Sequence, residues 1–367
     1  MIDRVKATLN LGQSIWLDYI DRGLLTGGEL KRLVDIGVRG LTSNPTIFEK
    51  AVSDSTDYDG TMHDAVRASP HANASAICEK LMTEDIKMAA DILRPVYDAS
   101  EGADGFVSLE VSPRLARDAA GTIAEAKRLW REVDRPNLMI KVPGTREGVP
   151  AIEALIAEGI NVNATLLFSA AHYEAVASAY IRGLERHPQP RRVASVASFF
   201  VSRVDTVVDK ALERVGTPKA LALRGKTAIA NTKSVYARFQ ETFHGDSFAR
   251  LRQRGARVQR PVWGSTSTKN PTYSDVLYIE GLIGPDTVNT MPPETLKAYL
   301  DHGAVQPSLL QRLDDARRCL TEVGHLGIDL AAVTEQLQVD GVAAFAASFD
   351  KLLAAIDGKR QRLGSER

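Results

Sequence analysis

The chain has 367 residues, of which 44% are hydrophobic, enough for a large core in one or two domains. Its 46 basic and 46 acidic residues balance, so charge gives no indication of a nucleic-acid or acidic-membrane partner. Residues 1–6 lack the apolar core of a signal peptide, and no apolar run is long enough to cross a bilayer. We therefore expect a cytoplasmic globular protein.

Signatures of metals and cofactors are missing from the sequence. Cys78 and Cys319 are isolated, which favours a reducing compartment without disulfides or a zinc cluster. The seven histidines form no pair with the spacing of metal ligands. Neither a Walker A motif nor a Gly-x-Gly-x-x-Gly turn after a strand is present. The sequence therefore predicts no metal and no cofactor.

Strand and helix patterns alternate along the chain. Short apolar runs rich in strand-forming residues predict strands at 14–18, 40–44, 105–111, 137–143, 160–167, 193–200, 257–264 and 286–291. Apolar residues at helical spacing predict helices at 27–36, over most of 46–103, and at 122–133, 150–159, 204–212 and 225–243. Another helix follows the N-cap Ser169, and from 293 the chain is predicted helical up to a polar tail at 358–367.

This alternation indicates a parallel sheet, and eight such units most simply close into a barrel. We predict an α/β fold, a (β/α)8 TIM barrel of the class I aldolase type with extra flanking and C-terminal helices. One domain would span 1–367, with helical additions at about 46–104, 217–256 and 293–360. The alternative is an open doubly wound sheet, which normally carries a nucleotide-binding fingerprint.

Side-chain alternation predicts which residues face the lumen of this barrel. Each strand has one apolar face, which must pack against the surrounding helices, so the polar face points into the lumen. Polar residues on that face also lie late in their strands, where barrel enzymes carry their chemistry. These residues are Asp18, Asn44, Glu110, Lys141, Asn163, Thr165 and Ser198.

Lys141 stands in the middle of an otherwise apolar strand. Such a lysine is ordinarily an edge-strand residue or one whose ammonium reaches water. The other interpretation is an amine held neutral by desolvation, which attacks a carbonyl to form a Schiff base. Each polar residue has a mundane explanation alone, for example capping a turn. Seven of them on six strands share one face and one depth, so we favour the Schiff-base interpretation.

The predicted cluster suits Schiff-base chemistry on a ketone. Lys141 attacks the carbonyl, and Glu110 with Thr165 holds a water that relays a proton. Asp18 takes a proton from the hydroxyl of the departing fragment while the imine accepts the electrons. Burial lowers the pKa of Lys141 and a close Glu110 raises it, and the sequence leaves open which effect dominates. We expect a water between these two side chains.

Several motifs together resemble transaldolase. They are Asp18, Gly-Leu-Thr-Ser-Asn-Pro-Thr-Ile-Phe at 40–48, Ser-Leu-Glu-Val at 108–111, Met-Ile-Lys-Val-Pro at 139–143 and the segment 159–169, in the order that the family uses. The resemblance covers nearly the whole barrel. It implies metal-free transfer of a dihydroxyacetone unit from sedoheptulose 7-phosphate to glyceraldehyde 3-phosphate, with erythrose 4-phosphate and fructose 6-phosphate as the products.

The same resemblance implies roles for single residues. Asp18, Glu110, Lys141 and Thr165 take the catalytic roles, Asn44, Asn163 and Ser198 contact substrate hydroxyls, and Arg203 binds phosphate. Many relatives add a serine and an arginine to the phosphate site. Here the stretch 263–269 offers Ser265 or Ser267 with Lys269, and we take Ser267 and Lys269. A lysine binds phosphate as a point charge, without the two-pronged contact of arginine.

Two rival functions fit parts of the sequence. A fructose 6-phosphate aldolase shares the fold and the lysine, but proteins of that type usually lack a glutamate matching Glu110. A non-catalytic phosphosugar-binding barrel needs a phosphate site but has no reason to bury Lys141 beside Asp18. We expect small phosphosugars as partners, with neither nucleic acid nor membrane, and the sequence leaves open whether the protein is a monomer or a homodimer.

Overall fold

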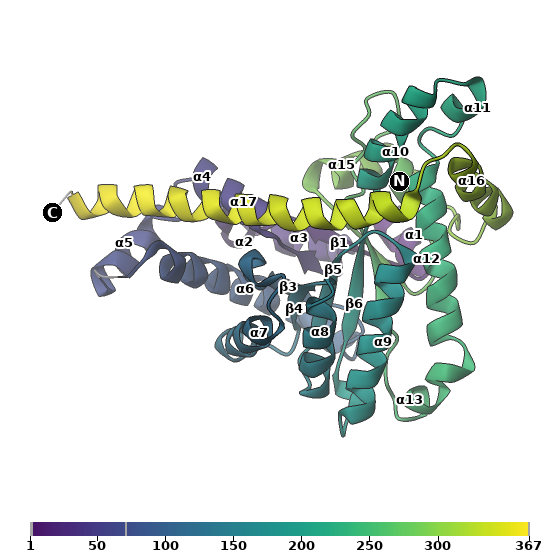
Figure 1. Ribbon diagram of the computed structural model, residues 1–367. Helices are drawn as coiled ribbons and strands as arrows, with labels where there is room; N and C mark the ends of the chain where they lie inside the picture. The colour runs from purple at the N-terminus through teal and green to yellow at the C-terminus, as the bar shows by residue number, and fades with distance from the viewer. Residues whose placement is uncertain (1–2, 70–71, 366–367) are drawn as a thin grey trace.

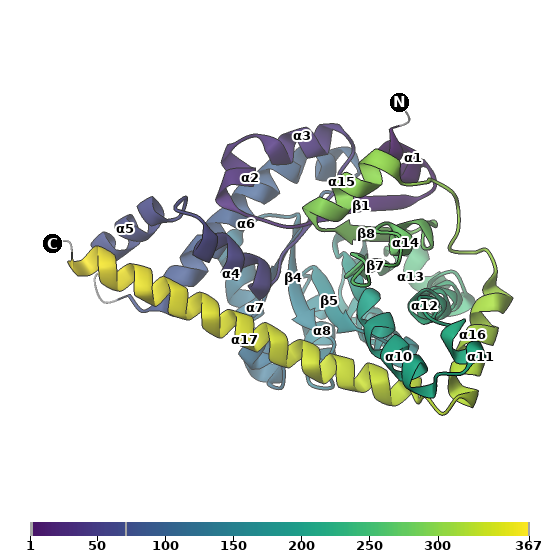
Figure 2. The ribbon, with the colours of Figure 1, turned by 90° about the horizontal axis from the view of Figure 1, so that it is seen from above.

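Eight parallel strands close into a barrel in chain order, as predicted (Figures 1 and 2). The computed structural model describes residues 3–69 and 72–365. The strands are β1 (Gln13–Asp18), β2 (Leu41–Thr42), β3 (Val107–Glu110), β4 (Leu138–Pro143), β5 (Val162–Leu167), β6 (Ser195–Phe200), β7 (Arg260–Gly264) and β8 (Thr287–Met291). Strand β2 is much shorter than predicted, because Asn44 already caps the helix that Pro45 begins.

Helices surround the barrel and fill the long connections. They are α1 (Arg4–Asn10), α2 (Arg22–Thr26), α3 (Glu29–Asp35), α4 (Pro45–Asp54), α5 (Asp59–Ala68), α6 (Ala74–Ala99), α7 (Ala119–Val133), α8 (Gly148–Ala157), α9 (Ala170–Arg186), α10 (Ser202–Val215), α11 (Pro218–Leu221), α12 (Thr227–Phe243), α13 (Ala249–Gln253), α14 (Leu277–Glu280), α15 (Pro293–His302), α16 (Leu313–His325) and α17 (Leu330–Ser365). No helix in the described ranges is both long and apolar enough to cross a membrane.

Three sequence predictions about helices need correction. The short helices α1, α2 and α14 lie in stretches where none was predicted. Helix α8 begins at Gly148, so Pro150 lies within its first turn rather than at its start. Helix α17 continues to Ser365, through most of the polar tail predicted at 358–367; residues 366–367 lie outside the described part of the chain.

The lumen of the barrel is filled by layers of side chains. An apolar layer that includes Trp16, Met139, Val196, Val262 and Val288 occupies its middle. One pleat further along the strands, the inward positions become polar: Glu110 on β3 pairs in register with Lys141 on β4. This order confirms the predicted alternation, in which Met139 and Lys141 share the inward face.

Beneath the apolar layer, at the end where the strands begin, a second polar group closes the barrel. We call it the base cluster: Ser14, Trp16, Asp104 and Arg260. The Trp16 indole donates to Asp104 Oδ1 at 2.7 Å, and the Ser14 hydroxyl donates to Oδ2. The Arg260 guanidinium donates to Ser14 Oγ at 2.6 Å and lies 3.5 Å from the Asp104 carboxylate. Every charged group in this cluster therefore has partners.

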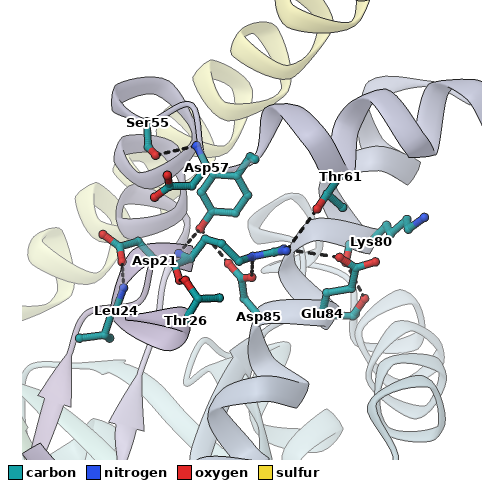
Figure 3. A network of polar contacts seen from close by, with 12 residues as sticks. Asp21, Leu24, Thr26, Ser55, Asp57, Thr61, Lys80, Glu84 and Asp85 are labelled. Atoms are coloured by element: carbon teal, nitrogen blue, oxygen red, sulfur yellow. Dashed lines mark hydrogen bonds and ion pairs between the residues drawn. The ribbon is translucent and has the colours of Figure 1, made fainter. Parts of the chain in front are cut away.

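An ion-pair network joins α2, which follows β1, to the helices between β2 and β3. The Arg22 guanidinium of α2 lies 2.6 Å from Asp85 and 3.4 Å from Glu84, both on α6 (Figure 3). The Tyr58 hydroxyl also donates to Asp85 at 2.7 Å. Burial raises the pKa of Asp85 to about 6, although Arg22 and Tyr58 oppose this shift. The network ties α2, α5 and α6 into one wall beside the barrel.

Helix α17 lies across the end of the barrel where the strands finish (Figures 1 and 2). Its buried residues Thr334, Leu337, Gly341, Phe345, Leu352 and Ile356 recur every three, four or seven positions, which makes one stripe of the helix. The Gln338 side chain donates to the carbonyls of Gly144 and Leu166, at the ends of β4 and β5. At its other end, Lys359 pairs with Asp59 of α5 at 2.8 Å. The helix is thus held by the ends of two barrel strands near its start and by α5 near its end.

Candidate active site

A cavity of about 370 Å³ opens at the end of the barrel where the strands finish; we call it the mouth cavity. Seven of the predicted site residues line it: Asp18, Asn44, Lys141, Ser198, Arg203, Ser267 and Lys269. The other three, Glu110, Asn163 and Thr165, are buried beside or beneath Lys141 rather than on the cavity wall. The strands thus bring together residues that are far apart in the sequence.

Lys141 is buried at the floor of the mouth cavity, with 4% of its side chain exposed. Its ammonium lies 3.1 Å from Glu110 Oε2 and donates to the Ser43 carbonyl at 3.0 Å. The ring of Phe345, from α17, lies 5.7 Å from the same nitrogen. The expectation of a water between Lys141 and Glu110 is wrong, because adjacent strands in register place the two groups in direct contact.

Glu110 is the most confined acid of the site, with 1% of its side chain exposed. Burial raises its pKa above the usual value of 4.5, and Asp18 raises it further, while the Lys141 ammonium opposes both. Its Oε1 atom has no hydrogen-bond partner among the described residues, and neither has the buried hydroxyl of Thr165. Buried polar atoms normally have a hydrogen-bond partner, so Glu110 Oε1 and the Thr165 hydroxyl are available to bind a water or a substrate.

Asp18 ends β1 at the edge of the mouth cavity. The Thr42 hydroxyl donates to its Oδ1 at 2.7 Å, and Thr42 in turn contacts the Thr290 hydroxyl at 2.7 Å. Burial raises the pKa of Asp18, whereas the charges of Lys141 and Arg203 lower it. Two carboxyl groups with raised pKa values therefore interact with one lysine, which is the kind of arrangement that active sites use.

The three predicted hydroxyl-binding residues differ in how much of each side chain is already used. Asn163 donates to Ser108 Oγ at 3.0 Å and accepts from the Ser198 hydroxyl at 2.7 Å, so its amide is occupied on both sides. Ser198 lines the cavity and keeps its oxygen free to accept. Asn44 caps α4 by accepting from the Ile47 amide at 3.0 Å, which leaves its NH2 group at the cavity wall.

Cations gather at the outer side of the mouth cavity. Arg203, at the start of α10, stacks over the Phe200 ring at 5.1 Å, and burial lowers its pKa. The Lys269 ammonium donates to Ser267 Oγ at 2.6 Å, and its pKa is lowered by burial and by the charges of Arg203 and Lys50. Three cations that repel one another so closely indicate a site for a doubly charged anion.

The mouth cavity favours Ser267 over Ser265 as the serine of this anion site. Both residues line the cavity. Ser265, however, lies in the left-handed region with φ 52°, and its hydroxyl contacts Ser202 Oγ at 3.0 Å. The hydroxyl of Ser267 instead meets Lys269. Ser267, the predicted serine, is thus the one whose hydroxyl contacts the cation.

Among the side chains of the mouth cavity that sequence reasoning missed are Lys50 and Phe345. Lys50 lies on α4, three positions after the cavity residue Ile47, so helical spacing could have placed it on the same face. Phe345 could not be found in this way, because its place depends on where α17 crosses the barrel. No group of three or more His, Cys, Asp or Glu side chains in residues 3–69 and 72–365 is arranged to hold a metal ion.

The chain is similar to several known proteins. Residues 15–356 match the family model described as Transaldolase/Fructose-6-phosphate aldolase. A protein of Thiobacillus denitrificans named Transaldolase is 49% identical over 356 residues, which is 96% of this chain and 99% of that protein. Transaldolases of Thermobifida fusca (49% over 349 residues, 93% of this chain and 94% of that one) and Mycobacterium ulcerans (46% over 359, 96% of each) are also similar. This chain therefore belongs to the transaldolase/fructose-6-phosphate aldolase family.

Proposed function

We propose that the protein is a transaldolase, which moves a dihydroxyacetone unit from sedoheptulose 7-phosphate to glyceraldehyde 3-phosphate. One observation carries this proposal: a buried lysine 3.1 Å from a buried glutamate forms the floor of a cavity whose outer side is cationic. The floor can form a Schiff base with a ketone, and the outer side suits a sugar phosphate. Family membership and the names of the similar proteins support the same activity.

The first step needs Lys141 as a neutral amine. Its ammonium can pass a proton to Glu110 Oε2 across the 3.1 Å contact, since burial raises the pKa of this glutamate. The amine then attacks the ketone carbon to give a carbinolamine. Glu110, now protonated, returns the proton through a water held between Oε1 and the Thr165 hydroxyl, the hydroxyl group leaves as water, and the protonated imine forms.

The second step breaks a carbon–carbon bond. Asp18 takes the proton from the hydroxyl on the carbon through which the departing fragment is bonded. The raised pKa of Asp18 makes it a stronger base. The bonding electrons move into the imine and form an enamine, while erythrose 4-phosphate leaves as the aldehyde. The enamine then attacks glyceraldehyde 3-phosphate, Asp18 returns its proton, and hydrolysis of the imine releases fructose 6-phosphate.

The remaining side chains hold the substrate. Ser198 accepts a hydrogen bond from one sugar hydroxyl, and its own bond to Asn163 orients the serine side chain. The Asn44 NH2 group donates to a second sugar hydroxyl. Arg203, Ser267 and Lys269 bind the phosphate, and we add Lys50 to this set. Phe345 covers Lys141, which shields the enamine from water until an acceptor arrives. Such shielding favours a transferase over an aldolase that releases free dihydroxyacetone.

Borohydride trapping tests the Schiff base. The protein is incubated with fructose 6-phosphate, reduced, digested and weighed by mass spectrometry. We expect a reduced dihydroxyacetone adduct on the peptide that contains Lys141, and none in Lys141→Met. The matched control is Lys233→Met, which removes another buried lysine far from the mouth cavity and should still be trapped. Trapping at any other lysine, or at none, would overturn the proposed nucleophile.

Acceptor dependence separates the two activities that give the family its name. Fructose 6-phosphate alone should release about one equivalent of glyceraldehyde 3-phosphate and then stop at the enamine. Addition of erythrose 4-phosphate should restart turnover. Continuous release of dihydroxyacetone without an acceptor would identify an aldolase instead.

We also propose that the protein works in the cytoplasm on small phosphosugars.

A further inference from the structure

A second cavity, which we call the base cavity, lies at the opposite end of the barrel from Lys141. Its volume of about 370 Å³ equals that of the mouth cavity. Residues just before β4, β5, β6 and β7 line it: Pro136, Gly159, Asn161, Ala194 and Arg257. It is therefore large enough for a metabolite of the size of a sugar phosphate, and it cannot share an occupant with the mouth cavity.

Three arginines give the base cavity a net positive charge. Arg191, Arg192 and Arg257 line it against a single acid, the exposed Glu101. Within the described residues, none of the three has a carboxylate within 4.0 Å, and the Arg257 guanidinium donates to the Glu101 carbonyl instead. Nearby, by contrast, Arg135 pairs with Asp91 at 2.5 Å. The charge of the base cavity is therefore left without compensation by the protein.

The loop that presents two of these arginines is held rigidly. Arg191 and Arg192 lie in the 3-10 turn Pro190–Arg192, which two prolines, Pro188 and Pro190, restrict. The Arg254 guanidinium donates to the His187 carbonyl at 2.9 Å. The His187 ring packs against Gly159, which has φ 85° and where an added Cβ would lie 2.8 Å from that ring. A loop fixed in this way loses little entropy when it binds a ligand.

Two half-buried aromatic side chains complete the wall of the base cavity. Tyr97 packs edge-to-face on Phe106 at 5.4 Å, and Gly102 and Gly105 both press against it. Trp130 of α7 stands on the same wall. Aromatic faces stack on planar rings, and arginine forks bind phosphate oxygens in pairs. The wall therefore combines the two surfaces that a nucleotide needs.

We propose that the base cavity binds a nucleoside polyphosphate, with Arg191, Arg192 and Arg257 on the phosphates and Tyr97 or Trp130 on the base. This binding is independent of the reaction at the mouth. The site is distinct from the cationic side of the mouth cavity, because the apolar layer of the barrel and the base cluster separate the two.

Calorimetric titration of the full chain with ATP, pyrophosphate and adenosine tests the proposal. We expect ATP to bind more tightly than either fragment, because only ATP meets both the arginines and the aromatic wall. Arg191→Ala/Arg192→Ala should weaken ATP binding about 10-fold or more, as two charge-assisted contacts are lost. The matched control, Arg67→Ala/Arg214→Ala, removes the same charge from exposed helix positions on α5 and α10 and should bind ATP as the wild type does.

Fructose 6-phosphate provides a second control, since saturating amounts should leave ATP binding unchanged. Four outcomes would overturn the proposal. They are no binding of ATP, equal weakening in both double variants, competition by fructose 6-phosphate, and pyrophosphate binding as tightly as ATP. Preferential binding of single-stranded DNA or of an acidic peptide would replace the nucleotide with a macromolecular partner. Tryptophan fluorescence provides an independent measurement of pyrophosphate binding. A change in it would come mainly from Trp130, because Trp16 and Trp263 are fully buried.

Discussion

The two ends of the barrel lumen each hold a buried ion pair, but they satisfy it differently. At the base, the Asp104 carboxylate accepts from Ser14 and Trp16 and lies beside Arg260, so both oxygens have partners. At the mouth, Glu110 touches Lys141 but leaves Oε1 without a partner. The apolar layer between them keeps the two pairs independent.

The ion pair at the base of the lumen therefore contributes to stability, whereas the pair at the mouth is suited to chemistry. A fully bonded ion pair holds its protons and its geometry, and breaking it leaves an uncompensated charge. A pair with unused oxygens can exchange protons and accept a ligand, at some cost in stability. Matched substitutions at the two ends should therefore have opposite effects on activity and on unfolding.

Lys141→Met should have the largest effect. Without the amine there is no Schiff base, so we expect the rate of transfer to fall by at least about 10⁴-fold. Glu110 can compensate for the lost cation by keeping its proton, since burial already raises its pKa, so the protein should still fold. A coupled assay measures the activity, and circular dichroism confirms the fold. Substantial remaining activity would mean that another group is the nucleophile.

Glu110→Gln should lower kcat by about 10²- to 10⁴-fold, the usual contribution of an acid–base group. The amide preserves the size of the side chain but cannot carry the proton away from Lys141. The KM for fructose 6-phosphate should change little, because Glu110 does not line the mouth cavity. A large rise in KM with an unchanged kcat would assign Glu110 to binding instead.

Arg260→Met is the counterpart of Lys141→Met at the base. We expect the free energy of unfolding to fall by about 2–4 kcal/mol, somewhat less than for a fully buried pair because Arg260 is partly exposed. Activity of the folded protein should stay within about twofold of the wild type, since the apolar layer separates Arg260 from the mouth. Urea denaturation and the coupled assay together measure both. Loss of activity without loss of stability would contradict the separation.

The pH dependence of stability gives the smallest but most specific signal. Below pH 4.5, Glu110 is protonated in the folded and the unfolded chain. As the pH rises from there to the raised folded pKa, the unfolded chain loses its proton first. The free energy of unfolding of the wild type should therefore fall relative to Glu110→Gln, by at most about 1.4 kcal/mol per pH unit. Denaturation of both proteins across this range measures the difference. A rise in the stability of the wild type relative to Glu110→Gln with increasing pH would contradict the predicted direction of the pKa shift.

The sequence predicted the barrel well because each strand carries its own local signal. Alternation along β3, β4 and β5 assigned Glu110, Lys141 and Thr165 to the lumen before their neighbours were known. Distances across strands carry no such signal. The direct contact between Lys141 and Glu110 depends on the register of two strands, and the bonds that occupy Asn163 depend on a third. Local patterns therefore find the members of a site but not their partners.

Helix α17 has a consequence for how the protein is made. It follows all eight strands in the chain, so during synthesis the barrel can emerge from the ribosome before Phe345 does. A nascent chain with a closed barrel still lacks the ring that covers Lys141. A premature stop codon before Phe345, or proteolysis there, would leave a barrel in which Phe345 no longer covers Lys141. Only chains translated through α17 would therefore contain a Lys141 that is covered by Phe345.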